Sequence, residues 1–176
     1  MIDVRKVDDI AIFDVEITPE TIEPLMYAIH KLIKNDPESK ILVYFSSVGG
    51  AYTHAELFIE FLNQLIDNII LVAFHQISSA GFKVFYSFKG ERYIMNHCFA
   101  IVHEGTKDVS VRDLSDKDSF DFFMTTDIME EMRAEINLIY HKYLTKKEMT
   151  RVINGKDVYL NTKRLRDILE LQNKET

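Results

Sequence analysis

A polar segment between a strand-like run and a helical pattern holds the residue types that acyl transfer needs. The apolar run 69–74 stops at residues 75–79 (HQISS), and apolar residues at helical spacing resume at Ala80. A serine at this junction stands at a helix N-terminus, where free backbone N–H groups can hold a developing oxyanion. The sequence alone leaves a second interpretation open, in which Ser78 or Ser79 only caps the helix.

Two further chemical elements also follow predicted strands. The pair Gly49-Gly50 comes after the apolar run 41–45, and His103 comes directly after the strand-like run 98–102. In an open parallel sheet, the carboxyl ends of the strands form the edge at which ligands bind. We therefore expect the glycine pair, Ser79 and His103 to converge on one edge of a sheet.

Alternating strand and helix patterns predict the elements that position these residues. Strands are predicted at 9–15, 41–45, 69–74, 92–95 and 98–102, and helices at 18–35, 51–65 and 79–88. Later segments are a long helix at 124–144, a helix from Thr145, a short strand or turn at 157–160 and a last helix ending at 171. This order predicts right-handed crossovers and a largely parallel sheet, which is an α/β fold.

Length and composition limit the function classes. The 176 residues fit one domain, and the net charge of −7 argues against non-specific nucleic-acid binding. No apolar run has membrane-spanning length, so no membrane association is expected. The single cysteine, Cys98, excludes an internal disulfide and a cysteine-rich metal site, and we interpret it as a buried core thiol. A cytoplasmic location is expected.

Five segments in order resemble the motifs of the Clp protease proteolytic subunit, a serine peptidase family of the crotonase-like superfamily. The segments are 47–50 (SVGG), 75–81 (HQISSAG), 89–92 (KGER), 101–104 (IVHE) and 156–161 (KDVYLN). The resemblance covers about residues 10–169. It implies repeated β-β-α units with a largely parallel sheet and a long handle helix, the handle region falling at about 104–145 of a single domain 1–176.

The resemblance also implies a Ser-His-Asp catalytic triad. It gives Ser79 as the nucleophile, His103 as the general base and Asp157 as the residue that holds the imidazole tautomer. The expected activity is therefore that of a serine endopeptidase. Neither a cofactor nor a metal is expected.

The residues around the triad have implied roles as well. The backbone N–H groups of Gly50 and Ala80 would form the oxyanion hole, and Val48 and Gly49 would offer an edge to an extended peptide. Family members cleave peptides or unfolded proteins inside homo-oligomeric heptameric rings, which can pair as double rings. Family members also carry more residues before the first strand, which form the loops that help to dock an ATPase unfoldase. Whether this chain has an unfoldase partner is therefore left open.

Departures from the family pattern support alternatives. Val48 replaces a proline, and His75 and Ser78 replace small residues beside the nucleophile. These changes favour a second hypothesis, a catalytically weak or inactive structural or regulatory ring subunit. A third hypothesis, an acyl-CoA enzyme of crotonase type, fits the fold but gives no role to a serine nucleophile.

Overall fold

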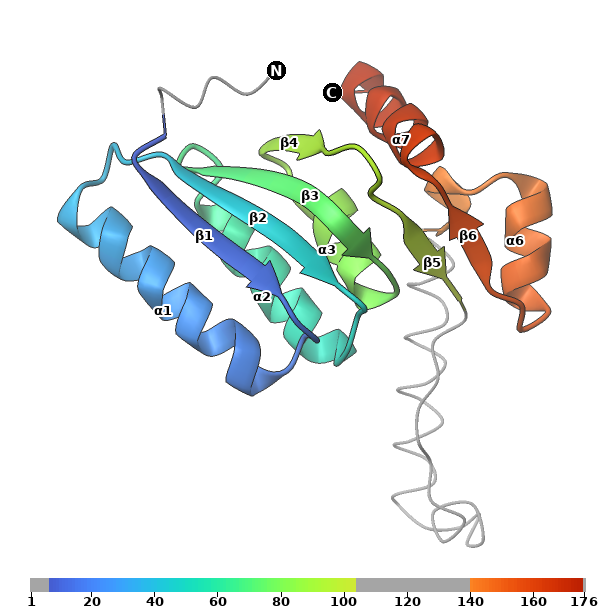
Figure 1. The fold of residues 1–176 in the computed structure, drawn as a ribbon, viewed down its shortest axis with the longest axis horizontal. Helices are drawn as coiled ribbons and strands as arrows, with labels where there is room; N and C mark the ends of the chain where they lie inside the picture. Colours follow the sequence, from blue (N-terminus) through green and yellow to red (C-terminus); the bar gives the residue numbers. More distant parts are fainter. Residues whose placement is uncertain (1–6, 104–139, 176) are drawn as a thin grey trace, which may run out of the picture. The chain divides into compact units, whose positions relative to one another are not determined.

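Four parallel strands form the main sheet in the order in which the chain makes them (Figure 1). They are β1 (Asp9–Asp14), β2 (Ile41–Ser47), β3 (Ile69–Ile77) and β4 (Glu91–Ile94). The computed structural model describes residues 7–103 and 140–175. Contacts divide the chain into two compact units, one of residues 1–102 with 159–176 and one of residues 103–158. The sheet belongs to the first unit.

Three helices connect the strands on one face of the sheet. They are α1 (Pro19–Asn35), α2 (Tyr52–Gln64) and α3 (Ala80–Ser87), and Figure 1 shows α2 and α3 behind the strands with α1 next to α2. Strands that are added in sequence by crossovers of one hand leave every helix on the same side. The core between these layers is aromatic, with ring centroids 5.5 Å apart for Phe13 and Phe45 and 5.9 Å apart for Phe13 and Phe58.

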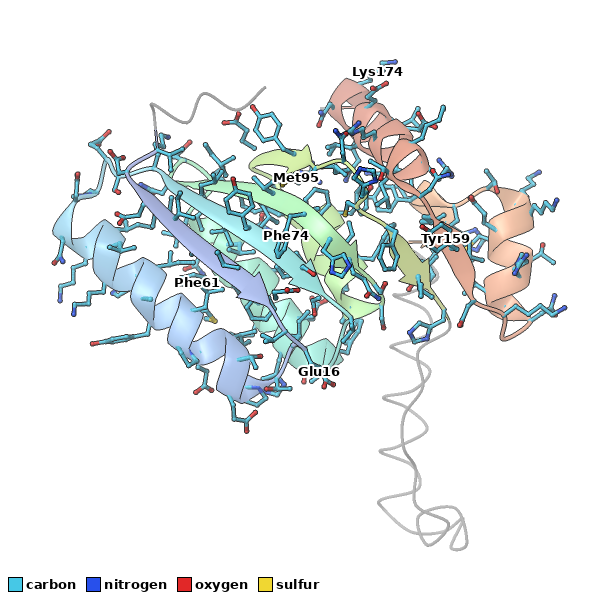
Figure 2. The ribbon with its side chains drawn as sticks, viewed as in Figure 1. Glu16, Phe61, Phe74, Met95, Tyr159 and Lys174 are labelled. Carbon is cyan, nitrogen blue, oxygen red and sulfur yellow. The ribbon has the colours of Figure 1, made fainter. Side chains whose placement is uncertain are left out.

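The opposite face of the sheet carries a row of apolar side chains. The parallel register places Ile10 with Leu42 and Ile12 with Tyr44, so these side chains share that face. The alternation of side chains along β3 places Phe74, labelled in Figure 2, on the same face. Its ring meets the ring of Tyr44 edge-on, with centroids 6.1 Å apart. Ile10 and Ile12 are 59% and 70% exposed. We call Ile10, Ile12, Tyr44 and Phe74 the open-face row.

The remaining described elements follow the sheet. β5 (Ala100–Val102) and β6 (Val158–Leu160) form a second, two-stranded sheet, and α7 (Thr162–Glu175) completes the first unit. In the second unit, α6 (Lys146–Ile153) begins with the predicted capping box, in which Thr145 and Glu148 each bond the other's backbone. No helix in the described part of the chain is long and apolar enough to cross a membrane.

The predicted α/β fold with its largely parallel sheet is confirmed, and several predicted bounds are corrected. The strand predicted at 41–45 extends to Ser47, and the strand predicted at 98–102 begins at Ala100. The strand predicted to stop at residue 74 continues to Ile77, and the last helix continues beyond residue 171 to Glu175. The polar residues after Phe74 stay in the strand because their backbone finds partners: Phe99 N–H donates to His75 O, and Ile77 N–H donates to Phe99 O. The predicted handle helix lies almost entirely outside the described residues.

Candidate active site

Two turns meet at the carboxyl edge of β2 and β3. The β2–α2 loop contains Gly49 and Gly50, and the β3–α3 turn contains Ser78 and Ser79. Ser78 N–H donates to Ser47 O across 2.9 Å, which joins the two turns. The predicted convergence of the glycine pair with the serine is therefore present in the first unit.

Ser79 has a backbone conformation that non-glycine residues rarely adopt. Its φ is 51° and its ψ is −123°, at the N-cap position of α3. The side chain does not cap the helix, and its hydroxyl makes no hydrogen bond to the described residues of the first unit. A capping serine would use its oxygen on the amides of the first turn, so the capping interpretation does not describe Ser79. Strain of this kind, held in place by surrounding structure, is concentrated at functional sites.

Ser78 is a structural residue by its contacts. It is 3% exposed, and its Oγ accepts hydrogen bonds from Ile101 N–H at 2.7 Å and from Gln76 Nε2 at 2.8 Å. Ile101 O in turn accepts from Ser79 N–H at 3.0 Å. The Ser78 hydroxyl thus secures the turn to the strand that leads into His103.

The glycine loop is tied to the end of β1. Ile17 N–H donates to Gly49 O at 2.7 Å, and Ala51 N–H donates to Ile17 O at 2.8 Å. Gly49 and Gly50 have φ values of 116° and 135°, where only glycine is unstrained. A Cβ at Gly50 would lie 2.3 Å from Ile17 O, and one at Gly49 would lie 2.7 Å from Ser79 Cβ. Both positions therefore require glycine.

The two predicted oxyanion donors are unoccupied amides. Neither Gly50 N–H nor Ala80 N–H donates a hydrogen bond to any group in the described part of the chain. Ala80 is the first residue of α3, where the helix has no acceptor for its own amide. Amides of this kind flanking a serine can stabilise negative charge on an oxygen.

Val48 and Gly49, the predicted substrate edge, differ in whether their backbone groups are available to a peptide. Gly49 uses both of its backbone groups, because its N–H donates to Ser47 Oγ at 3.1 Å and its O accepts from Ile17 N–H. Val48 is 58% exposed, and its backbone makes no hydrogen bond among residues 7–103 and 140–175. Val48 is thus the position in this loop at which a peptide backbone could pair.

His103 and Asp157 lie in the second unit. His103 is half-buried, and its backbone carbonyl accepts a hydrogen bond from Tyr140 Oη at 3.3 Å. Burial raises the pKa of the Tyr140 hydroxyl well above its usual range, so this hydroxyl stays a neutral donor. Asp157 is exposed, and its backbone carbonyl accepts from Arg151 at 3.1 Å. Its carboxylate makes no hydrogen bond or ion pair within the described part of the second unit.

Cys98 is the buried thiol that the sequence indicated. It is 1% exposed, and burial raises its pKa from 9.0 to about 12. At neutral pH almost none of it is thiolate, the nucleophilic form. Among the described residues, no group of three or more histidine, cysteine or acidic side chains could hold a metal ion.

Sequence reasoning missed the anchors of the site. Ile17 and Ile101 hold the two turns through their backbone groups, and their side-chain types carry no sign of that role. The strained backbone conformation of Ser79 was also missed, since the amino-acid sequence does not distinguish a strained serine from one that caps a helix. The family alignment alone distinguished Ser79 from Ser78.

Comparisons with known proteins identify the fold and the family of the chain. A search of curated proteins finds no match. Among solved structures, a ClpP1 mutant from Listeria monocytogenes is similar, with a TM-score of 0.68 and 16% identity over 90% of this chain and 86% of that chain. That likeness establishes the fold. The family model described as Clp protease matches residues 5–163, so the chain belongs to the Clp protease family.

Proposed function

We propose that the protein is a serine endopeptidase that cleaves peptides or unfolded proteins. The observation that carries the proposal is Ser79, a strained residue whose hydroxyl does not cap its own helix. It precedes Ala80 and lies against Gly49, the neighbour of Gly50, and neither the Ala80 nor the Gly50 amide donates a hydrogen bond within the described residues. Such a serine is poised to attack a carbonyl rather than to stabilise the helix. Family membership supports the same reaction class.

The mechanism is acyl transfer in two steps. His103 takes the proton of Ser79 Oγ while Oγ bonds to the scissile carbonyl carbon, and the carbonyl oxygen becomes an oxyanion. Collapse of this tetrahedral intermediate breaks the C–N bond, and His103 returns the proton to the leaving amine. Water then adds to the acyl-enzyme with His103 again as the base, and release of the acid restores Ser79.

The oxyanion would be held by Gly50 N–H and Ala80 N–H. Both are backbone donors in well-anchored turns, so they need little reorganisation when charge develops. Each donor in a site of this kind lowers the barrier by roughly 3–4 kcal/mol. Glycine at position 50 also lets the substrate approach the loop closely.

Asp157 is proposed as the third member of the triad. It directly precedes β6, and its exposed carboxylate has no competing partner in the described part of its unit. Catalytic hydrogen bonds often form only when substrate is bound. The orienting role of Asp157 toward His103 therefore requires a rearrangement or a binding event.

The second candidate function is an inactive ring subunit. The carboxylate of Asp157 favours it, because it is exposed and makes no hydrogen bond or ion pair in the described part of its unit, whereas a working triad needs its acid in contact with the base. A protein of this kind would assemble into a ring but would not cleave peptides. The two candidates are separated by the chemistry of Ser79.

Covalent labelling with a fluorophosphonate probe tests the activated serine. We expect the wild-type protein to be labelled on Ser79, as located by peptide mapping, because the probe captures serines activated by a base and an oxyanion hole. Ser79→Ala should abolish the label, and Ser78→Ala should keep labelling at position 79 if the variant folds. A correctly folded wild type that takes no label would favour the inactive subunit, and label on Ser78 would show that the assignment is wrong by one residue.

Assembly into a homo-oligomeric ring, alone or as a double ring, is the second part of the proposal. Ile10 and Ile12 of the open-face row are exposed apolar side chains on a single face of the sheet, which self-association would remove from water. Enclosure of the active sites in a ring would suit a peptidase working in the cytoplasm.

The assembly can be checked with Ile12→Glu. We expect light scattering or native mass spectrometry to report a ring for the wild type and smaller species for Ile12→Glu, since a carboxylate on the row would be buried at the contact. Ile66→Glu changes an isoleucine that is 42% exposed in the loop before β3, and it should leave assembly intact. A wild type that is a stable monomer would exclude the ring.

A further inference from the structure

A buried lysine lies one helical turn after the proposed nucleophile. Lys83, in the first turn of α3, is 6% exposed and is the only buried side chain with a charge in the described part of the chain. Its ammonium pairs with the Glu56 carboxylate, donates to Tyr52 Oη and lies 3.7 Å from the centroid of the Tyr52 ring. We call Tyr52, Glu56 and Lys83 the polar cluster.

Burial of this ammonium needs a reason. Removing two charges from water costs more than a well-packed apolar pair would, so an ion pair of this kind contributes little net stability. Its neighbours in α3 are all buried and mostly apolar, so an apolar residue would be the ordinary choice at position 83. Unlike apolar contacts, hydrogen-bonded charges have directional geometry and fix one arrangement.

The polar cluster joins the first turns of the two helices that begin at the site. Tyr52 is the first residue of α2, two positions after Gly50, and Glu56 lies one turn further along the same helix. Lys83 N–H donates to Ser79 O at 3.3 Å, so the lysine belongs to the turn that follows the nucleophile. Tyr52 and Glu56 therefore follow the first proposed oxyanion donor, Gly50, along the chain. Lys83 follows the second proposed donor, Ala80.

We infer that the polar cluster is a positioning device, which holds the N-terminal turns of α2 and α3 at the separation that the oxyanion hole requires. The inference rests on the proposed function. Two amides stabilise one oxygen only when both lie within hydrogen-bond distance of it, so a small slip of α2 against α3 would uncouple them. In this role the side chains of Lys83, Glu56 and Tyr52 take no part in the reaction and act through the helices that carry them.

Kinetics and hydrogen exchange on Lys83→Met, Glu56→Gln and the double variant test the inference. We expect kcat for a short peptide to fall about 10- to 100-fold in each single variant, with KM nearly unchanged, because the loss is confined to the transition state. The double variant should lose no more than the worse single variant, since the two residues act as a unit. Exchange at amides 48–52 and 78–82 should accelerate about twofold or more, while β4 stays unchanged.

The controls separate positioning from packing and from the proposed function itself. Lys89→Met removes an exposed lysine just beyond α3 and should match the wild type. A lower melting temperature with kcat and exchange at the two turns unchanged would overturn the inference, as would a loss confined to KM. If the wild type takes no fluorophosphonate label, the proposed function fails and the exchange measurement alone decides. If Lys83→Met does not fold, Glu56→Gln decides, because it alters a half-exposed residue and keeps its shape.

Discussion

Replacing His103 by alanine is expected to lower kcat/KM for a fluorogenic peptide by about 10³- to 10⁴-fold. Without a base, the Ser79 hydroxyl keeps its proton and attacks poorly, and the leaving amine has no proton donor. Initial rates on wild type and variant measure the effect, and light scattering shows whether the assembly is intact.

His75 provides the matched control for that substitution. It is an exposed histidine near the end of β3, and its ring packs edge-on against Phe99 at 5.7 Å. His75→Ala should keep activity within about threefold of the wild type, since it removes only surface packing. Full activity in His103→Ala would remove His103 from the mechanism, and equal losses in the two variants would point to a general loss of structure.

Gly49→Ala is expected to cost about 100-fold or more in kcat/KM, together with about 1–3 kcal/mol of stability. The new methyl group would lie 2.7 Å from Ser79 Cβ and 3.2 Å from Ser79 Oγ, so it must push the nucleophile out of place. The φ of 116° adds backbone strain for any side chain. Steady-state kinetics and thermal unfolding on the same sample measure both losses.

Gly155→Ala separates strain from displacement of the nucleophile. Gly155 also has a positive φ, at 67°, but a Cβ there would meet nothing within 4 Å. This variant should lose about 1 kcal/mol of stability and keep its activity. If Gly49→Ala lost only stability, Ser79 would tolerate the contact and the geometry of the loop would not limit catalysis.

The helical and strand patterns were enough to predict the main sheet, and the reasons are local. Thr18 and Pro19 begin α1, and the capping box at Thr145 begins α6, because each start depends on a few neighbouring residues. The end of β3 was predicted wrongly because it depends on Phe99, a partner more than twenty positions away. A polar residue looks like a strand end when its distant hydrogen-bond partner is unknown.

For the site too, features that depend on the order of strands and helices could be predicted, and features that depend on distant partners could not. The positions of Ser79 and Gly49 at one sheet edge could be predicted, since parallel strands align their carboxyl ends. The strained φ of Ser79 and the contacts of Ser78 could not, because both depend on the backbone of Ile101. Lys83 could have been recognised from the sequence, since it is the one charged residue at the start of an otherwise apolar helix. The roles of His103 and Asp157 stay predictions.

The bonds of Ile101 to the serine turn also affect when the site can form during synthesis. Ser78 and Ile101 are 23 positions apart, so in a growing chain the serine turn leaves the ribosome before the strand that secures it. Until then the turn lacks two of its hydrogen bonds, and the strained conformation of Ser79 has less to maintain it. The strained serine turn is therefore secured late, after most of the first unit has been made.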